Sequence, residues 1–204
     1  ELIKIAQESF LGALKDRSDD IKDFIIQRAR GFLIEELSKE NRDYATNFAD
    51  SVFATGGRDI LDIFARAHTL LPLRKENEHE FESLVTAFKR ASNIVKKADG
   101  KKTRILDAAK IALLTLPVEQ ALVRQVHDVK AFIIQGANQG HSIHDLKVRY
   151  RDIFGHITSI KPKLDAFFDQ VMVMVDDEKL KDARLALLSE IKTIADKIAD
   201  FTHL

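Results

Sequence analysis

The sequence predicts an all-α fold, and three observations support this prediction. Only 3 prolines and 8 glycines occur among 204 residues, so few positions would interrupt a helix. Residues that favour helices, such as leucine, alanine, lysine and glutamate, are abundant, whereas runs of β-branched residues are few. Apolar residues also recur with helical spacing along most of the chain. Because 45% of the residues are hydrophobic, we expect the helices to form a bundle around a buried core.

Residues 1–75 are predicted to form a first group of helices. The first helix has an apolar stripe from Leu2 to Leu14 without a capping residue before it, so it is expected to begin at or before residue 1. Ser18 or Asp19 can cap the second helix. The apolar stripe of that helix consists of Ile21, Phe24, Ile25, Ala29, Phe32, Leu33 and Leu37.

Two further helices are expected in this group. The third covers residues 44–53 and ends near Gly56 and Gly57, which can terminate a helix. Asp59 can cap the fourth helix, which is expected to stop at Pro72 because proline disrupts helical hydrogen bonding. Its apolar stripe contains Ile60, Phe64 and Leu71.

Residues 76–204 are predicted to form a second, larger bundle. Its first helix covers residues 76–97 and breaks at Gly100, and one face carries Phe81, Leu84, Val85, Phe88 and Val95. Residues 101–116 are apolar but contain no clear start or stop signal. Pro117 suits the first turn of the next helix, whose core face would be Leu122, Val126, Val129 and Ile133.

The remaining helices are predicted from their capping signals. A glycine-containing turn at residues 136–140 precedes Ser142, which can cap a helix with Leu146, Tyr150, Ile153 and Ile157 inward. Pro162 starts a helix that reaches Val171. Asp176 and Asp177 can cap the last helix, where a spacing close to seven, typical of antiparallel bundles, relates Leu180, Leu187, Ile194 and Phe201.

These patterns together predict the core. Its expected members are Phe81, Leu84, Phe88, Leu122, Phe167, Val171, Leu187, Ile191 and Ile198. Met172 and Met174 are also interpreted as core residues of a helix, in preference to a soft partner-binding surface.

Composition narrows the possible location and partners of the protein. The absence of cysteine removes disulfides and thiolate chemistry, and no stretch approaches the roughly 20 apolar residues that cross a bilayer. We therefore expect a cytoplasmic protein without a membrane partner. The 32 basic and 32 acidic residues balance, so any nucleic-acid site must be a local cluster of positive charge.

Two His-Asp pairs were considered as catalytic or metal-binding candidates. His127-Asp128 and His144-Asp145 contain ligand types found in metal-dependent phosphohydrolases. Adjacent residues on a helix point about 100° apart, so neither pair can face one metal ion without help from elsewhere. The sequence therefore predicts no catalytic residue, no metal site and no cofactor bound by this chain.

A basic cluster in the segment 88–104 is the strongest candidate for a binding site. With Phe88 at the centre of the core face and about 100° per residue, five residues occupy an arc of roughly 120° that points away from the core. They are Lys89, Arg90, Asn93, Lys96 and Lys97, and the segment continues with Lys101, Lys102 and Arg104. A solvated helix back is the alternative interpretation.

Several motifs resemble the C-terminal part of the beta subunit of bacterial glycyl-tRNA synthetases. The segment AFFDQVMVMVDDE at residues 166–178 is followed by RLALL at residues 184–188 and by ADF at residues 199–201. Upstream, FKRASNI at residues 88–94 and LPVEQAL at residues 116–122 match in order and spacing. The histidines near residue 141 and His203 depart from the family pattern.

The resemblance implies that residues 1–75 form a helical connector and residues 76–204 an anticodon-binding helical bundle similar to that of arginyl-tRNA synthetases. It implies that the basic residues of segment 88–104 bind tRNA, with no role for DNA. It further implies an α2β2 glycine-tRNA ligase, a class II synthetase whose alpha subunit carries the catalytic centre and uses ATP and Mg²⁺.

Two other functions remain open on the sequence alone. The chain could be a structural domain that contacts other subunits of the same assembly without touching tRNA, in which case its basic face is merely solvated. An independent hydrolase is the third possibility, and it would require a bound metal and turnover.

Overall fold

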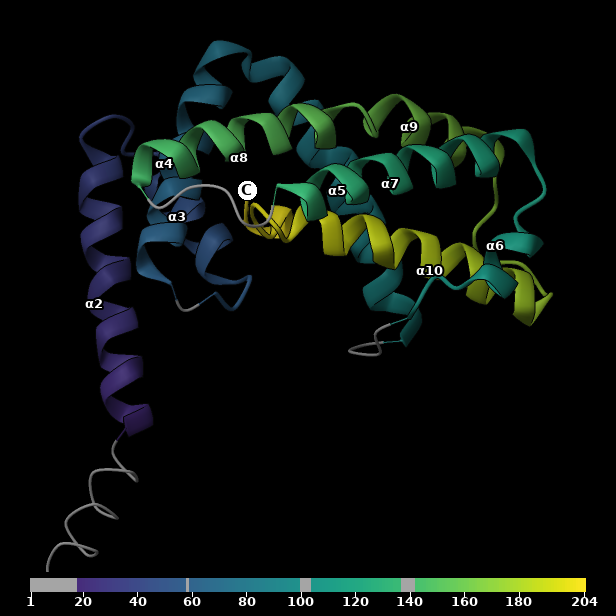
Figure 1. Cartoon of the computed structure of the whole chain (residues 1–204), viewed down its shortest axis with the longest axis horizontal. Helices are drawn as coiled ribbons and strands as arrows, with labels where there is room; N and C mark the ends of the chain where they lie inside the picture. Colours follow the sequence, from purple (N-terminus) through teal and green to yellow (C-terminus); the bar gives the residue numbers. More distant parts are fainter. Residues whose placement is uncertain (1–17, 58, 100–103, 137–141) are drawn as a thin grey trace, which may run out of the picture.

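The structure is a computed structural model, which describes residues 18–57, 59–99, 104–136 and 142–204 (Figure 1). The predicted all-α fold is confirmed, since no described residue belongs to a β-strand. The α-helices in chain order are α2 Ser18–Ser38, α3 Ala45–Phe53, α4 Ile60–Glu76, α5 Glu78–Asp99, α6 Ala108–Leu113, α7 Pro117–Gln135, α8 Ile143–Thr158, α9 Lys161–Gln170 and α10 Glu178–Ala195, followed by the 3₁₀-helix η1 Phe201–His203. The helix predicted for residues 1–14 lies outside the described residues.

Helix α10 runs below α7 in the view of Figure 1 and is buried along its middle. It packs against α5, α6 and α7, and every residue from Ala183 to Ser189 is buried. An uninterrupted buried run means that α10 is covered on all sides over two turns. The chain then turns back so that η1 packs on α3 and α5, which places the last residues in the middle of the fold (Figure 1).

A series of hydrogen bonds and an ion pair joins the first predicted unit to the second. The Tyr150 hydroxyl on α8 donates a hydrogen bond to Asp62 on α4, and Asp62 pairs with Arg66 at 2.9 Å. Arg66 also donates from Nη1 to the Ile198 carbonyl oxygen at 3.3 Å. Burial and the hydrogen bond to Asp62 raise the pKa of the Tyr150 phenol, so the phenol stays a donor at neutral pH.

Helix α2 extends away from the body of the molecule (Figure 1). The apolar stripe predicted from the sequence runs along α2, but of its members only Leu33 and Leu37, near the end of the helix, are buried. The other large apolar members of the stripe, Ile21, Phe24, Ile25 and Phe32, are exposed. The helix is therefore held by its last turns, which pack on α3 and α4.

Two predicted boundaries were wrong, and one helix was not predicted. Helix α4 continues through Pro72 to Glu76, because the buried Arg74 anchors the last turn by ion pairs to Glu78 and Glu82. The apolar segment after residue 104 contains α6, which is capped by Asp107. Helix α10 ends at Ala195, so Phe201 is buried from η1 rather than from a continuous helix.

The interpretation of Met172 and Met174 as helical core residues was also wrong. Helix α9 ends at Gln170, and the segment 171–177 before α10 is not helical. Alternate side chains of this segment point in opposite directions: Val171 and Val173 are buried, whereas Met172 and Met174 are 73% and 54% exposed. The sequence VMVM follows a period of two, as in an extended chain.

Apart from the two methionines, the predicted core is confirmed. The nine buried residues are Phe81, Leu84, Phe88, Leu122, Phe167, Val171, Leu187, Ile191 and Ile198. The core forms one cluster that includes Leu33 and Ile63 from the first predicted unit together with Phe88 and Leu187 from the second. The predicted division between residues 75 and 76 falls inside α4, one residue before its end. Because the core is continuous across it, the existence of two separate units stays a prediction.

Replacing Phe88 by alanine is expected to destabilise the fold by about 3 to 5 kcal/mol, because a large buried side chain would leave a cavity. Phe88 is 1% exposed and packs edge to face on Phe201. Urea unfolding of the variant measures the loss. The exposed Phe24 provides the matched control, since Phe24→Ala should change stability by less than about 1 kcal/mol. Equal stability of wild type and Phe88→Ala would contradict the packing described.

Candidate nucleic-acid interface

Helix α5 presents one buried face and one charged face. Its first turn is acidic, with Glu78 and Glu80, and its last turn contains Lys96 and Lys97, which matches the direction of the helix dipole. The buried face includes Phe81, Leu84, Phe88 and Val95 and packs largely on α10. The opposite face exposes Arg90, Asn93, Lys96 and Lys97, and Lys89 at its edge is half-buried. We call these five residues the basic arc.

Of the other three predicted site residues, the structure describes only Arg104. Lys101 and Lys102 lie outside the described residues. Arg104 is turned toward α10, where its Nε donates to Asp182 Oδ1 at 2.7 Å and its side chain is only 11% exposed. The hydrogen bond from Arg104 lowers the pKa of Asp182. Arg104 thus joins the segment before α6 to α10, and it is separate from the basic arc.

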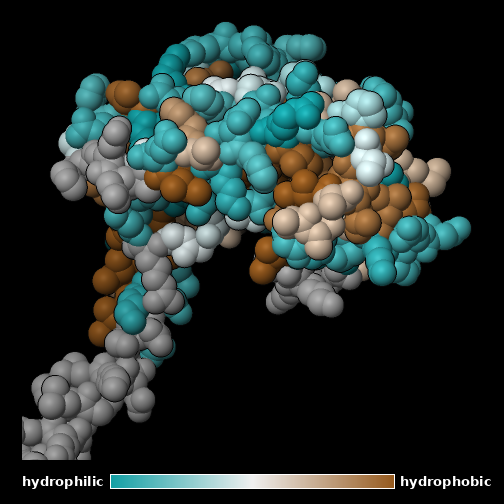
Figure 2. All heavy atoms as spheres, turned by 45° about the vertical axis from the view of Figure 1, so that its right-hand side comes forward, coloured by the Kyte–Doolittle hydropathy of each residue, from teal (hydrophilic) through white to brown (hydrophobic). Residues whose placement is uncertain are grey.

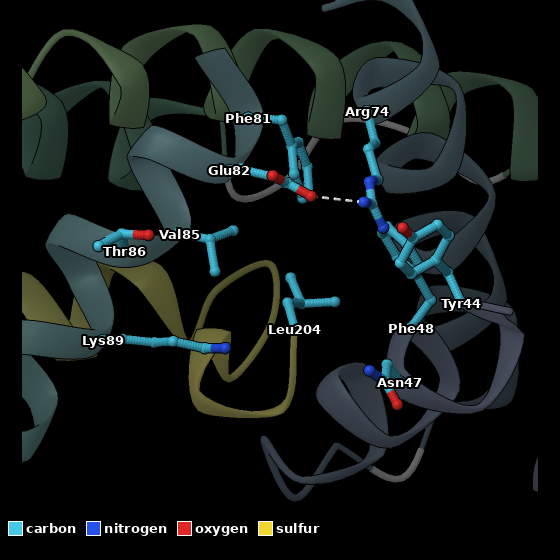
Figure 3. Close-up of a pocket in the computed structure, with 10 residues that line it drawn as sticks. All are labelled: Tyr44, Asn47, Phe48, Arg74, Phe81, Glu82, Val85, Thr86, Lys89 and Leu204. Atoms are coloured by element: carbon cyan, nitrogen blue, oxygen red, sulfur yellow. Dashed lines mark hydrogen bonds and ion pairs between the residues drawn. The ribbon is translucent and has the colours of Figure 1, made fainter. Parts of the chain in front are cut away.

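The side chain of Lys89 extends from the basic arc toward a small pocket between α3, α5 and the end of the chain (Figure 3). The pocket has a volume of about 180 Å³, and its lining includes Tyr44, Asn47 and Leu204. On its far side Arg74 stacks over the Tyr44 ring at 3.3 Å and pairs with Glu82 at 2.6 Å. The ammonium group of Lys89 therefore faces a partly enclosed hollow lined by both polar and apolar residues.

Arg90 leaves the opposite edge of the basic arc toward α9. Its guanidinium carbon lies 4.2 Å from the ring centre of Phe168, which is the geometry of a cation–π contact. Beside this pair is a groove of about 560 Å³. Its lining comprises Arg90, Ile94, Phe168, Asp169, Gln170, Val171, Met172, Val173 and Met174.

The final helix does not share the exposed face of α5. Since α10 is buried over residues 183–189, it cannot present a surface beside the basic arc. Its partly exposed acidic residues face other elements, as Glu190 pairs with Lys130 of α7 at 2.5 Å. The candidate site is therefore built on α5 together with the groove that α9 and the following segment form.

A buried ion pair that the sequence motifs did not reveal holds this region together. Arg184 of the RLALL motif donates from Nε to Glu119 Oε1 at 2.7 Å, and both side chains are buried. Glu119 also accepts from the Leu116 backbone N–H at 3.0 Å, at the start of α7. Arg184 Nη1 donates to the Met172 carbonyl oxygen at 2.8 Å. The pair thus fixes α7, α10 and the segment that carries Met172.

The histidine and aspartate pairs are located away from this region. His127 and Asp128 are exposed on α7. Ser142 caps α8, and Asp145 completes the capping box by accepting hydrogen bonds from Ser142. Across the ranges that the structure describes, no group of three or more such side chains could hold a metal ion. Nor do the described helices include one that is long and apolar enough to span a membrane.

Hydrophobic surface gathers at two places (Figure 2). One is the projecting helix α2, with Ile21, Phe24 and Ile25 exposed. The other lies at the end of the molecule that carries α6 and the start of α7, where Ile105, Leu113 and Leu116 are exposed.

Comparison with known proteins gives a consistent result. The family described as the DALR anticodon binding domain matches residues 84–200, from the middle of α5 to the turn before η1. The glycine–tRNA ligase beta subunits of Acidobacterium capsulatum and Ralstonia nicotianae are each 31% identical to the chain, over 87% and 100% of its length. That of Tolumonas auensis is 30% identical over 100% of the chain. The chain spans about a quarter of the length of these curated relatives, from 25% to 27%.

Removing the charge of Arg184 should destabilise the fold by about 3 to 5 kcal/mol, because Arg184→Met leaves the buried Glu119 carboxylate without its partner. Denaturant unfolding of the single variants and of Glu119→Leu/Arg184→Met tests this. The double variant should lose much less than the sum of the single losses. Lys161→Met, which breaks the more exposed pair with Asp165, is the matched control and should cost at most about 1 kcal/mol. Additive losses would show that the two buried charges do not interact.

Proposed function

We propose that this chain, which belongs to the family of DALR anticodon-binding domains, binds tRNA through the basic arc of α5. The observation that carries the proposal is the exposed cationic face opposite Phe88, which lies inside the matched region. Arg90, Lys96 and Lys97 supply exposed positive charge on one side of a single rigid helix, with Asn93 between them.

The residue types of the basic arc suit RNA. Lysine and arginine contact phosphates and position the nucleic acid, whereas an amide such as that of Asn93 can reach a base or ribose edge. The chain has no net charge to attract RNA from a distance, so binding depends on local contacts and on salt. We infer that the chain by itself binds weakly.

The likeness to beta subunits of glycine–tRNA ligase supports a wider proposal for the whole protein. The chain would form the C-terminal part of such a subunit and would hold tRNA while catalysis occurs elsewhere. The complete enzyme, an α2β2 assembly in the cytoplasm, would join glycine to its tRNA with ATP and Mg²⁺ at the alpha subunit. Neither ATP nor a metal is assigned to this chain.

A second role, contact with other parts of a larger assembly, is favoured by the exposed apolar residues of α2 and of the α6 region. Exposed clusters of this kind are typical of protein interfaces, and the relatives are about four times as long as the chain. The two roles use different surfaces, so they are compatible.

Charge removal on the basic arc is expected to weaken RNA binding in a salt-dependent manner. In Lys89→Ala/Lys96→Ala/Lys97→Ala, loss of up to three phosphate contacts should lower the slope of log affinity against log salt by about two to three. Fluorescence-anisotropy titrations with tRNA over a series of salt concentrations measure this slope. Thermal melts should show little change, because Lys96 and Lys97 are exposed and the half-buried Lys89 lies at the edge of a pocket outside the core.

The matched control removes the same charge elsewhere. Lys39, Arg124 and Lys179 are exposed at the end of α2, on α7 and on α10, and their replacement by alanine should leave the slope nearly unchanged. If the basic-arc variant stays folded and keeps the wild-type affinity and slope, tRNA does not bind at α5. The contact role would then be the better explanation.

A further inference from the structure

We propose that the groove between α5 and the segment 171–174 holds an unpaired nucleobase of the bound RNA. This inference rests on the proposed tRNA-binding function and adds to it a site that accepts a base, whereas the basic arc accepts phosphates. Phe168, Arg90, Met172 and Met174 form the apolar and planar walls of the groove, and Asp169 and Gln170 supply polar groups at its edge.

Arg90 provides a surface for stacking. One side of its guanidinium group lies over the Phe168 ring at 4.2 Å, while the Arg90 side chain remains exposed. Phe168 is in turn supported by an edge-to-face contact with the buried Phe167, with ring centres 5.8 Å apart. Guanidinium planes and aromatic rings are the groups on which proteins stack unpaired RNA bases. A base on the outer side of Arg90 would complete a stack of three planar groups.

Two exposed methionines also line the groove. Val171 and Val173 are buried, so the side chains of Met172 and Met174 between and after them must point to the surface. The Arg184 guanidinium binds the Met172 carbonyl oxygen at 2.8 Å and fixes this backbone from below. Exposing two large apolar side chains has no folding benefit, whereas polarizable thioethers pack well against aromatic rings.

The charges around the groove favour a base over a phosphate. Asp169 lines the groove and would repel a phosphate, but its carboxylate can accept a hydrogen bond from a base amino group. Gln170 can donate to a base and accept from it. Lys97 lies two turns further along α5 than Arg90 and therefore points in nearly the same direction from the helix axis. The adjoining phosphate can bind there. A nucleotide can therefore place its base in the groove and its backbone on the basic arc.

Arg90→Lys separates stacking from charge, because lysine keeps the positive charge but has no plane. With an RNA hairpin whose single-stranded loop carries the glycine anticodon, this variant is expected to bind about 5- to 150-fold more weakly than wild type, with the salt slope unchanged. Met172→Ser/Met174→Ser should also weaken binding without affecting the slope. Ile134→Ser, an exposed apolar residue on α7, is the matched control and should bind as wild type does.

Hairpins with 2-aminopurine at successive loop positions identify the base directly. One position should change its fluorescence on binding to wild type, and the change should be absent in Arg90→Lys and in the methionine variant. If wild type binds the hairpin with a salt slope that depends on the basic arc, but these variants keep full affinity and the fluorescence change, the groove is not a base site while the proposed function stands. If wild type does not bind RNA at any salt concentration, both proposals fail.

Discussion

The buried ion pair between Arg184 and Glu119 is the interaction on which the arrangement of the second half of the chain depends. Charges removed from water are tolerated only when each one is closely paired and its other hydrogen-bonding groups are satisfied. Here the Glu119 carboxylate serves both Arg184 and the start of α7, and Arg184 also binds the Met172 carbonyl oxygen. Because α10 is buried along its middle, the pair anchored on it links α7 and the segment after α9 to the core.

The packing of α5 on α10 also determines which face of α5 is exposed to a partner. Phe88 and its neighbours on α5 pack largely on α10, and the C-terminal Phe201 packs against the Phe88 ring at 5.4 Å. With that face covered, the helical period leaves Asn93, Lys96 and Lys97 in solvent. The position of the basic arc is thus a consequence of the core, and the groove beside Arg90 is a consequence of where the ion pair holds the segment 171–174.

Helical periodicity predicted most of the fold, because the buried faces of α5, α7 and α8 each follow a regular apolar spacing. It failed where local pattern and tertiary environment disagree. Val171 to Met174 are all apolar, so spacing alone could not distinguish an extended segment with two exposed methionines from a buried helix. Pro72 predicts a helix end because proline disrupts helical hydrogen bonding. The ion pairs from Arg74 beyond it involve Glu78 and Glu82 of the next helix, which the local sequence of α4 does not contain. The site was predicted in part: the arc on α5 follows from spacing, whereas the contacts of Arg90 and Arg104 depend on helices distant in sequence.

A protein with balanced charge needs a short-range way to recognise RNA, and the exposed side of α5 offers two different kinds of contact. Lys96 and Lys97 act through charge, which salt screens and which does not depend on the base. The groove beside Arg90 has a plane, apolar walls and an acidic group, so its interactions depend on the base and little on salt. The lysines and Arg90 belong to one rigid helix, so a nucleotide that contacts the lysines is held close to the groove. Affinity and selectivity could then change independently, because substitutions at Lys96 and at Met172 alter different physical terms.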